Sequence, residues 1–504
     1  MKLFTALVQD LSHTSDEVKT IELLTDYFTS AQNPVCRDQA LNFLLGHLPK
    51  RIINSRQLKR LAPDITGFPG WLVERSENEV GNFVQTLHLL LRPKYPVQGT
   101  ISLTEWMKEL QKYRNAPEKA IQDLIKEKIS GSPEDQRLML LKLLTGTFKS
   151  PVSKKVTVNS LAKTLGITPE ISCLRLYHCE LNRQISFENL SRKIESEELL
   201  VPTEFPDSIP VPTADSCNLT DKKWEYFGKK EGIEAQLIKR GDSVYLWTRD
   251  GEIISDKVPE IVGSTLHIRS NLTLYGQVIP KNKDAPLELL YSRLNKKSIT
   301  KKDPEDFVAQ FEIWESFNED HQKINRIFAN HPNVRPVELH SYTSKEALID
   351  FHNKCRVRGF SGVILKPRNK SVYHRWKANS LAANLILMYV EFGRVDHTGI
   401  RSMTFGAYLQ NELLPVAKVS EIDSELDAGE IFNFVKENTL ERFGPVRTVK
   451  PFRVYKIEFD GLSKSSRRKS GLVLACPKIH KKIGDDPRLA HSIRFLTGLL
   501  SRRK

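Results

Sequence analysis

The sequence predicts a multidomain fold with an all-α N-terminal domain, an α+β domain and a small C-terminal β-barrel. Two changes of pattern along the 504 residues lead to this prediction. Apolar side chains recur at helical spacing in the first part of the chain, and short alternating strands dominate later. A second change follows Trp376, where short strands surround one helix. We therefore place the domains at 1–205, 216–380 and 381–504.

The N-terminal domain is predicted from helical periodicity together with helix start and stop signals. The apolar face of a first helix consists of Leu3, Phe4, Leu7, Val8 and Leu11. Thr14 and Glu17 have the spacing of a capping box, which predicts the start of a second helix. Its inward-facing side chains are expected to be Val18, Ile21, Leu24 and Phe28. Residues 136–146 are predicted to form a buried helix that ends at Gly146, and 156–167 another short helix.

The α+β domain begins after a segment rich in proline. Residues 199–215 contain four prolines and no helical period, so we expect a linker that runs over the surface. From Ile233 apolar and polar residues largely alternate, and Gly241-Asp242 provides a two-residue hairpin turn. Further strands are expected at 264–271, 272–280, 307–315 and 361–367.

The C-terminal domain shows a hairpin, then a helix, then more strands. Residues 403–409 and 413–419 are expected to pair, and a helix is expected at 428–438. Strands at 454–462 and 470–477 follow. A few short strands with one inserted helix fit a Greek-key barrel such as an OB-fold, a barrel that commonly binds nucleic acid.

The composition indicates a polyanionic partner. The formal net charge is +15, and such an excess of Lys and Arg favours nucleic acid or an anionic membrane surface. The sequence contains no apolar run of about 18 residues, so it predicts no membrane span. Gln9 and Asp10 interrupt the apolar N-terminal stretch, which argues against a signal peptide. The six cysteines are scattered without a C-x-x-C pair, which is typical of reduced thiols in a cytosolic protein.

The stretch "FGKKEGIE" places two lysines just ahead of the predicted hairpin. A side chain at the mouth of a strand can be held rigidly toward a pocket, so Lys229 is a candidate nucleophile. A solvated lysine is the alternative at such a position.

Four segments carry a resemblance that covers nearly the whole chain: "LPKR", "LLTGTFKSPVSKK", "TLERFGPVRTVKP" and "RRKSGLVL". Together with the lysine stretch they resemble the ATP-dependent DNA ligases, in particular the bacterial type with a helical DNA-binding domain. The resemblance implies that 1–205 is that domain, that 216–380 is an ATP-grasp-like adenylation (nucleotidyltransferase) domain, and that 381–504 is the OB-fold. It implies ATP and Mg²⁺ as cofactors and DNA repair or recombination in the bacterial cytoplasm as the setting.

The family works through the lysine of a K-x-D-G-x-R motif, and "KKEGIE" is similar to it. The resemblance implies that Lys229 attacks the α-phosphate of ATP and becomes lysyl-AMP. A neutral amine is required, so nearby positive charge must depress its pKa. Glu231 stands where the family has Asp, and Glu234 where it has Arg. Glu234 either faces solvent at the strand start or reverses the charge of a ligand-binding position.

Further site residues are carried over by the resemblance. Those expected to bind the nucleotide are Arg249, Phe311, Lys366, Arg375, Lys377 and Lys478. The aromatic ring of Phe311 would stack on adenine, and a place in the core is the alternative. Gln277 and Ser361 replace metal-binding carboxylates, so no metal ligand is assigned with certainty, although Glu231 or Glu312 could substitute. Ala475 replaces one arginine that grips the outer phosphates of ATP.

The DNA-binding residues are expected on the flanking domains. Residues 464–482 contain seven Lys or Arg and no Asp or Glu, and this run is either a phosphate-binding stripe or a solvated face. The candidates for contacts to the phosphate backbone are Lys50, Arg51, Lys149, Lys154, Lys155, Arg467, Arg468 and Lys469.

Three functions remain open at this stage. The first is a ligase that seals nicks in double-stranded DNA through Lys229. The second is a catalytically impaired paralogue that clamps nicked or damaged duplex. A distant third is an RNA-end ligase, against which the helical N-terminal domain argues. We expect a monomer that contacts no membrane and that works with DNA-repair proteins.

Overall fold

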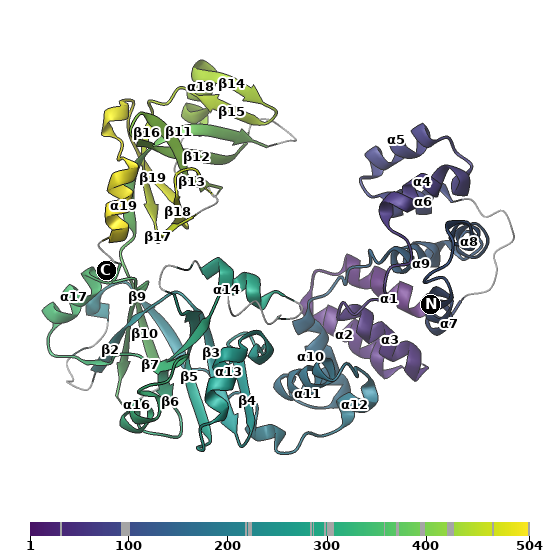
Figure 1. Cartoon of the computed structure of the whole chain (residues 1–504), viewed down its shortest axis with the longest axis horizontal. Helices are drawn as coiled ribbons and strands as arrows, with labels where there is room; N and C mark the ends of the chain where they lie inside the picture. The colour runs from purple at the N-terminus through teal and green to yellow at the C-terminus, as the bar shows by residue number, and fades with distance from the viewer. Residues whose placement is uncertain are drawn as a thin grey trace. The chain divides into compact units, whose positions relative to one another are not determined.

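The computed structural model describes residues 1–30, 33–91, 101–216, 219, 224–282, 285, 287–296, 299, 307–356, 358–368, 372–393, 399–420, 428–465 and 468–501. The chain forms two compact units (Figure 1). Unit 1 comprises Met1–Val201 and the short loop Asp250–Ile253. Unit 2 comprises Pro202–Arg249 and Ile254–Lys504.

Unit 1 is helical, as its apolar periodicity predicts. Its α-helices are α1 Lys2–His13, α2 Glu17–Thr29, α3 Pro34–Leu44, α4 Ser55–Thr66, α5 Gly70–Val80, α6 Phe83–Leu90, α7 Leu103–Lys112, α8 Glu118–Leu124, α9 Glu134–Thr145, α10 Lys154–Leu165, α11 Pro169–Leu181 and α12 Phe187–Ser191. A π-turn, Ile125–Ile129, extends α8. Burial is complete for Leu24, Phe28, Leu41 and Trp106, so the helices pack their apolar faces on one another.

The helix signals were confirmed in part. Helix α9 ends at Gly146, which adopts φ 64°, as the stop signal predicts. Helix α2 is capped by Asp16, whose carboxylate accepts from Val18 N–H, so the capping box on Thr14 is wrong. Val18 was expected to face inward but is 66% exposed, because the face of α2 that packs on the core carries Leu24 and Phe28.

The first part of unit 2 contains two five-stranded sheets. Sheet 1 has the order β1-β10-β9-β2-β8 and sheet 2 the order β4-β3-β5-β6-β7. The strands of sheet 1 are β1 Asp207–Val211, β2 Trp224–Lys229, β8 His340–Ser341, β9 Gly362–Pro367 and β10 Val372–Lys377. The strands of sheet 2 are β3 Ile233–Arg240, β4 Ser243–Thr248, β5 Leu272–Pro280, β6 Ala309–Ser316 and β7 Val334–Pro336. The helices are α13 Pro259–Leu266, α14 Leu287–Leu294, α16 His321–Phe328 and α17 Lys345–Asn353.

The two sheets meet through a cluster of large side chains. This aromatic cluster consists of Phe227, Ile364 and Tyr373 from sheet 1 and of Tyr275 and Trp314 from sheet 2. All five are at most 1% exposed. Their rings lie within packing distance, with 5.3 Å between the centroids of Tyr275 and Trp314. The opposite face of sheet 2 packs on α13, α14 and α16 through a second core, which includes Leu237, Leu274 and Phe311.

Two expectations for this part were wrong. The segment 199–215 is more than a linker, because β1 pairs in parallel with β10 at the edge of sheet 1. Pro210 is tolerated there because an edge strand can leave one side of its backbone unpaired. Residues 264–271 do not form a strand, since Pro259 starts a helix that runs to Leu266. The hairpin at Gly241 is confirmed, with φ 50°.

The last part of unit 2 is a curled sheet in the form of a half-barrel, organised around a long central strand (Figure 1). Its strands are β11 Leu381–Phe392, β12 Ile400–Leu409, β13 Glu412–Val419, β14 Thr439–Phe443, β15 Val446–Val449, β16 Val454–Phe459 and β19 Lys478–Gly484. A two-stranded ladder, β17 Gly461–Lys464 and β18 Leu472–Ala475, and the helices α18 Ala428–Asn438 and α19 Ile493–Ser501 complete it. Strand β11 pairs with β12, β15 and β16, which is how one long strand curls a sheet.

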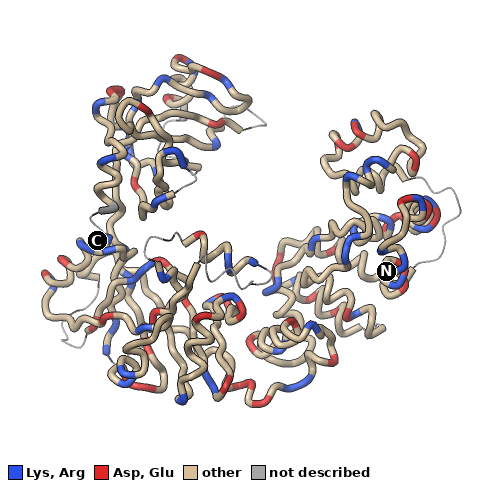
Figure 2. The backbone as a smooth tube through the Cα atoms, viewed as in Figure 1, with Lys and Arg blue, Asp and Glu red and all other residues tan. Residues whose placement is uncertain are grey.

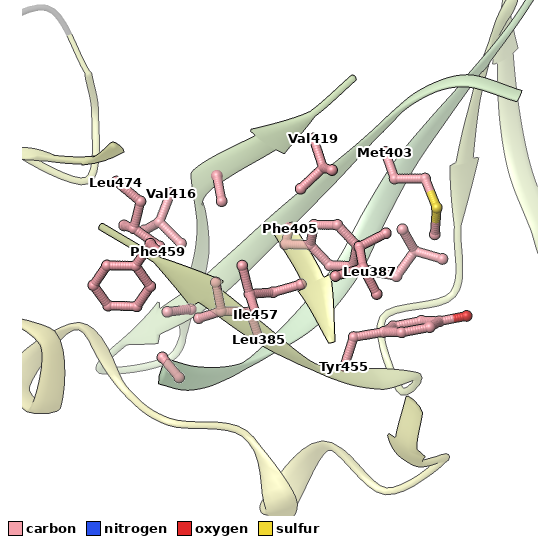
Figure 3. Close-up of a cluster of buried hydrophobic side chains, with 14 of the residues drawn as sticks. Leu385, Leu387, Met403, Phe405, Val416, Val419, Tyr455, Ile457, Phe459 and Leu474 are labelled. Atoms are coloured by element: carbon pink, nitrogen blue, oxygen red, sulfur yellow. The ribbon is translucent and has the colours of Figure 1, made fainter. Parts of the chain in front are cut away.

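The core of this curled sheet is apolar on its inner face, as Figure 3 shows for Leu385, Leu387, Phe405 and Tyr455 among others. The predicted class is therefore confirmed: a helical N-terminal region, an α+β part and a C-terminal OB-like β-structure. None of the helices in the described ranges combines the length and apolarity that a membrane crossing needs.

Candidate nucleotide site between the two sheets

Lys229 is the last residue of β2 and lies between the two sheets. Its side chain is only 15% exposed, and its Nζ lies 5.6 Å from the centroid of the Trp314 ring. The amine donates to the carbonyl of Lys230 at 3.4 Å and lies 3.9 Å from Glu234 Oε1. Burial lowers the pKa of Lys229, Glu234 opposes this shift, and Arg375 adds to it. The environment therefore favours the neutral, nucleophilic amine more than water does.

The carboxylate of Glu234 lies among three basic side chains of this site, Lys229, Arg249 and Arg375. Its side chain is only 9% exposed, so the solvent-facing interpretation is wrong. Strand alternation places it on the face opposite Ala235, toward sheet 1. Its carboxylate accepts from Tyr275 Oη at 3.0 Å and from Arg249 Nη1 at 3.3 Å, and it forms a short ion pair with Arg375 Nη2.

A second carboxylate, Glu312, is fully engaged beside the first. Lys230 Nζ lies 2.5 Å from Glu312 Oε1, and Arg335 Nη2 lies 2.9 Å from the same oxygen. Gln277 Nε2 donates to Glu312 Oε2 at 3.0 Å. Burial alone would raise the pKa of Glu312, but Lys230, Gln277 and Arg335 together bring it below the usual value. Glu312 is thus a charged partner in an internal ion-pair network.

A third carboxylate, Glu315, is hydrogen-bonded to Tyr373 of the aromatic cluster. It accepts from Tyr373 Oη at 2.5 Å, and Lys366 Nζ lies 3.9 Å from it. Burial, reinforced by Glu315, raises the pKa of Tyr373, so this hydroxyl remains a hydrogen-bond donor. The candidate phosphate-binding residue Lys366 therefore already has an anionic neighbour.

The residues at the expected metal positions do not fit Mg²⁺. Gln277 is buried and offers its amide, and Ser361 donates its hydroxyl to the Lys229 carbonyl at 3.0 Å. Glu231 is exposed and Glu312 is saturated by cations. Among the described residues no group of three or more His, Cys, Asp or Glu side chains could hold a metal ion. Mg²⁺ requires carboxylate oxygens that this site has committed elsewhere.

The donors suit the phosphates of ATP better. Lys229 at the end of β2, Arg249 just after β4 and Arg375 within β10 converge on Glu234, and Lys366 lies on β9. Nε of Arg375 is buried without a hydrogen-bond partner in the described part of the chain. Cations and an unsatisfied N–H are groups that phosphate oxygens accept.

Three of the predicted nucleotide contacts, Phe311, Lys377 and Lys478, lie apart from this group. Phe311 is fully buried in the core on the far face of sheet 2, with Ile313. The period of two along β6 instead turns Glu312 and Trp314 toward sheet 1, a signal that was already present in "QFEIWE". Lys377 pairs with Asp460 at 3.0 Å, and Lys478 is exposed on β19.

Sequence reasoning missed Trp314, Tyr373 and Glu315 as neighbours of the site. Their roles depend on strand register, because Tyr275 lies opposite Glu315 on adjacent strands. Alternation along β6 could have indicated Trp314, but no local signal points to Tyr373.

The candidate DNA contacts are mostly exposed. Those in unit 1 lie on two segments joined by a hydrogen bond from Ile52 N–H to Leu144 O at 2.9 Å, and they are Lys50, Arg51, Lys149, Lys154 and Lys155. Lys154 is engaged with Glu180 at 2.6 Å. In unit 2, Arg468 and Lys469 are exposed, and Arg467 lies outside the described residues. Figure 2 shows Lys and Arg spread along the chain and interspersed with Asp and Glu.

Comparison with known proteins gives the following relatives. No family model matches the chain. A "Probable DNA ligase" of Koribacter versatilis (strain Ellin345) is 22% identical over 545 aligned positions, which cover 96% of this chain and 94% of the relative. A "DNA ligase" of Thermococcus fumicolans is 20% identical, covering 69% and 68%.

Two solved structures are similar to this chain at low TM-scores. The structure "Pmar-Lig_Pre." is 12% identical with a TM-score of 0.45, covering 95% of this chain and 99% of that chain. The structure "mycobacterial DNA ligase D complexed with ATP and MES" is 14% identical with a TM-score of 0.30, covering 57% and 98%.

Proposed function

This chain is a distant member of the ATP-dependent DNA ligase family, and we propose that it binds nicked duplex DNA and transfers AMP through Lys229. The observation that carries the proposal is the placement of Lys229 between the two sheets, where burial lowers its pKa. We extend the proposal to the sealing of nicks in DNA repair.

The proposed chemistry has three steps. Neutral Lys229 Nζ attacks the α-phosphorus of ATP, the bond to the β-phosphate breaks, pyrophosphate leaves and the amine loses a proton. A 5′-phosphate oxygen at the nick then attacks the phosphorus of the lysyl-AMP, the phosphorus–nitrogen bond breaks, and the lysine takes up a proton as it leaves. The 3′-hydroxyl finally attacks the 5′-phosphate, loses its proton to solvent, displaces AMP and closes the backbone. Arg249, Lys366 and Arg375 would hold phosphate charge in the first step.

Labelling with α-labelled ATP tests the chemistry. We expect a protein band that keeps the label on a denaturing gel, because the phosphoramidate is covalent. Nick sealing is then measured with a fluorescent nicked duplex. A wild-type protein that binds the nick but never becomes labelled would contradict AMP transfer.

That outcome would favour a second candidate function, a DNA-binding protein impaired in catalysis. The specific observation behind it is the carboxylate of Glu234 among Lys229, Arg249 and Arg375. In this case the protein would hold nicked or damaged duplex for other repair enzymes. Binding then depends on the basic surfaces and not on the lysine.

Binding to DNA is predicted to weaken steeply with salt, because phosphate contacts release counterions. Arg468→Ala/Lys469→Ala should flatten the plot of log affinity against log salt by up to ~2, near one per lost phosphate contact. Unrelated DNA sequences should be affected equally. The measurement is a titration of fluorescent nicked duplex at several salt concentrations.

A matched control for that titration is Lys323→Ala/Arg326→Ala, which removes two exposed cations from α16. It changes the net charge by the same amount and should leave the salt slope nearly unchanged. Equal slopes for wild type and both variants would mean that Arg468 and Lys469 merely face solvent.

A further inference from the structure

The facing sides of the two sheets carry opposite charges. Sheet 1 and the residue that follows β2 supply the cations, which are Lys229, Lys230, Lys366 and Arg375. Sheet 2 supplies the carboxylates, which are Glu234, Glu312 and Glu315. Every one of these cations has a carboxylate of the other sheet within 4 Å. The ion pairs therefore bridge the space in which the proposed nucleotide chemistry takes place.

Glu234 is the most heavily engaged of the three carboxylates. Its Oε1 faces Lys229 and Arg375, and its Oε2 faces Arg249 and the Tyr275 hydroxyl. Arg375, Arg249 and Tyr275 donate hydrogen bonds to this carboxylate, and Lys229 adds a basic group at 3.9 Å. A phosphate oxygen presents the same acceptor geometry and charge sign to these donors.

We propose that Glu234 is a counterion built into the nucleotide site, which occupies the phosphate-binding cations until a nucleotide displaces it. The proposal rests on the function proposed above, since it assigns those cations to the phosphates of ATP. Glu234 thereby lowers the affinity for nucleotide.

The charge balance explains why displacement can occur. The carboxylate of Glu234 brings one negative charge to two arginines, Arg249 and Arg375, with Lys229 at 3.9 Å, so its charge alone does not balance theirs. The unpartnered Nε of Arg375 adds a donor that Glu234 leaves unused. An incoming polyanion gains these groups as hydrogen-bond partners. Glu234 then loses its own partners, and this cost lowers the affinity for the polyanion.

The test is the ATP affinity of Glu234→Gln, measured by isothermal titration calorimetry without divalent cation and with pyrophosphate as a second probe. The amide keeps the size of the side chain and removes its charge. We expect the Kd for both ligands to fall by about tenfold or more, which corresponds to about 1.4 kcal/mol. An unchanged or higher Kd in a folded Glu234→Gln protein would overturn the proposal.

The matched control is Glu391→Gln on β11. Glu391 also gathers two cations and a hydroxyl, with Lys418 and Ser402 at 2.9 Å and Arg401 at 3.3 Å. It lies on the curled sheet and outside the Lys229 network. Its ATP and pyrophosphate affinities should equal those of the wild type, and an equal gain there would make the effect one of net charge only.

A second variant covers the case in which Glu234→Gln does not fold. Glu234→Asp keeps the charge and withdraws it by one methylene from the phosphate-binding side chains, so ATP should bind tighter than to wild type. Equal Kd values for wild type and Glu234→Asp would then overturn the proposal.

Covalent labelling separates this inference from the function on which it rests. Tighter ATP binding by Glu234→Gln with no labelling of either protein would sink AMP transfer and retain the role of Glu234. Labelling of wild type together with equal Kd values would retain AMP transfer and sink the role of Glu234.

Discussion

Lys229→Ala is expected to lose covalent labelling by α-labelled ATP completely, whereas Lys230→Ala should still be labelled. The two amines lie side by side in sequence but in different surroundings. The carboxylate nearest to Lys229 Nζ is Glu234 at 3.9 Å, beyond hydrogen-bonding distance, whereas Lys230 Nζ is bound to Glu312 at 2.5 Å. An amine held in a tight ion pair is a poor nucleophile.

The assay is a denaturing gel after incubation with nucleotide, in the wild-type and the Glu234→Gln backgrounds. The Glu234→Gln background is included because its tighter ATP binding should give a visible band even where the wild-type protein reacts slowly. Far-UV circular dichroism of each variant serves as the folding control. A band that persists in Lys229→Ala and disappears in Lys230→Ala would show that the neighbouring lysine is the nucleophile.

Trp314→Ala is expected to destabilise unit 2 by about 3–5 kcal/mol, the usual range for removing a buried aromatic side chain. Trp314 is 1% exposed, and its ring lies 5.5 Å from Phe227 and 6.1 Å from Tyr373, which belong to the opposite sheet. Its loss leaves a cavity where the two sheets meet. Urea unfolding followed by circular dichroism measures the change.

Trp71→Ala is the matched control, because Trp71 is 65% exposed on α5 and its removal leaves no cavity. Its unfolding midpoint should stay close to that of the wild type. A Trp314→Ala protein as stable as Trp71→Ala would mean that the aromatic cluster does not hold the sheets together.

Local signals predicted the parts of the site that depend on neighbouring residues. The hairpin at Gly241 follows from a short pattern, and the structure has it. Lys229 precedes the hairpin as expected, but it is the last residue of β2, a strand that the sequence analysis did not predict. The alternation of β3 likewise separates Glu234 from Ala235 and Leu237. These features need only the period of two along a strand.

The partners of Glu234 could not be predicted in this way. Arg375 is 141 residues away in sequence, and only the pairing of the sheets brings the two together. The register between β5 and β6 similarly decides that Tyr275 and Trp314 share a face. The candidate lysine was therefore within reach of sequence reasoning, while the carboxylate network around it was not.

The pairing of β1 with β10 has a consequence for any attempt to isolate the second unit as a shorter fragment. A fragment that starts at residue 216 lacks β1, so the backbone of β10 from Val372 to Trp376 becomes a bare sheet edge. It also lacks Phe205, which packs against Tyr275 with 5.9 Å between ring centroids. Exposed edges recruit other chains, so such a fragment should self-associate, and one that starts at Pro202 should remain monodisperse in gel filtration.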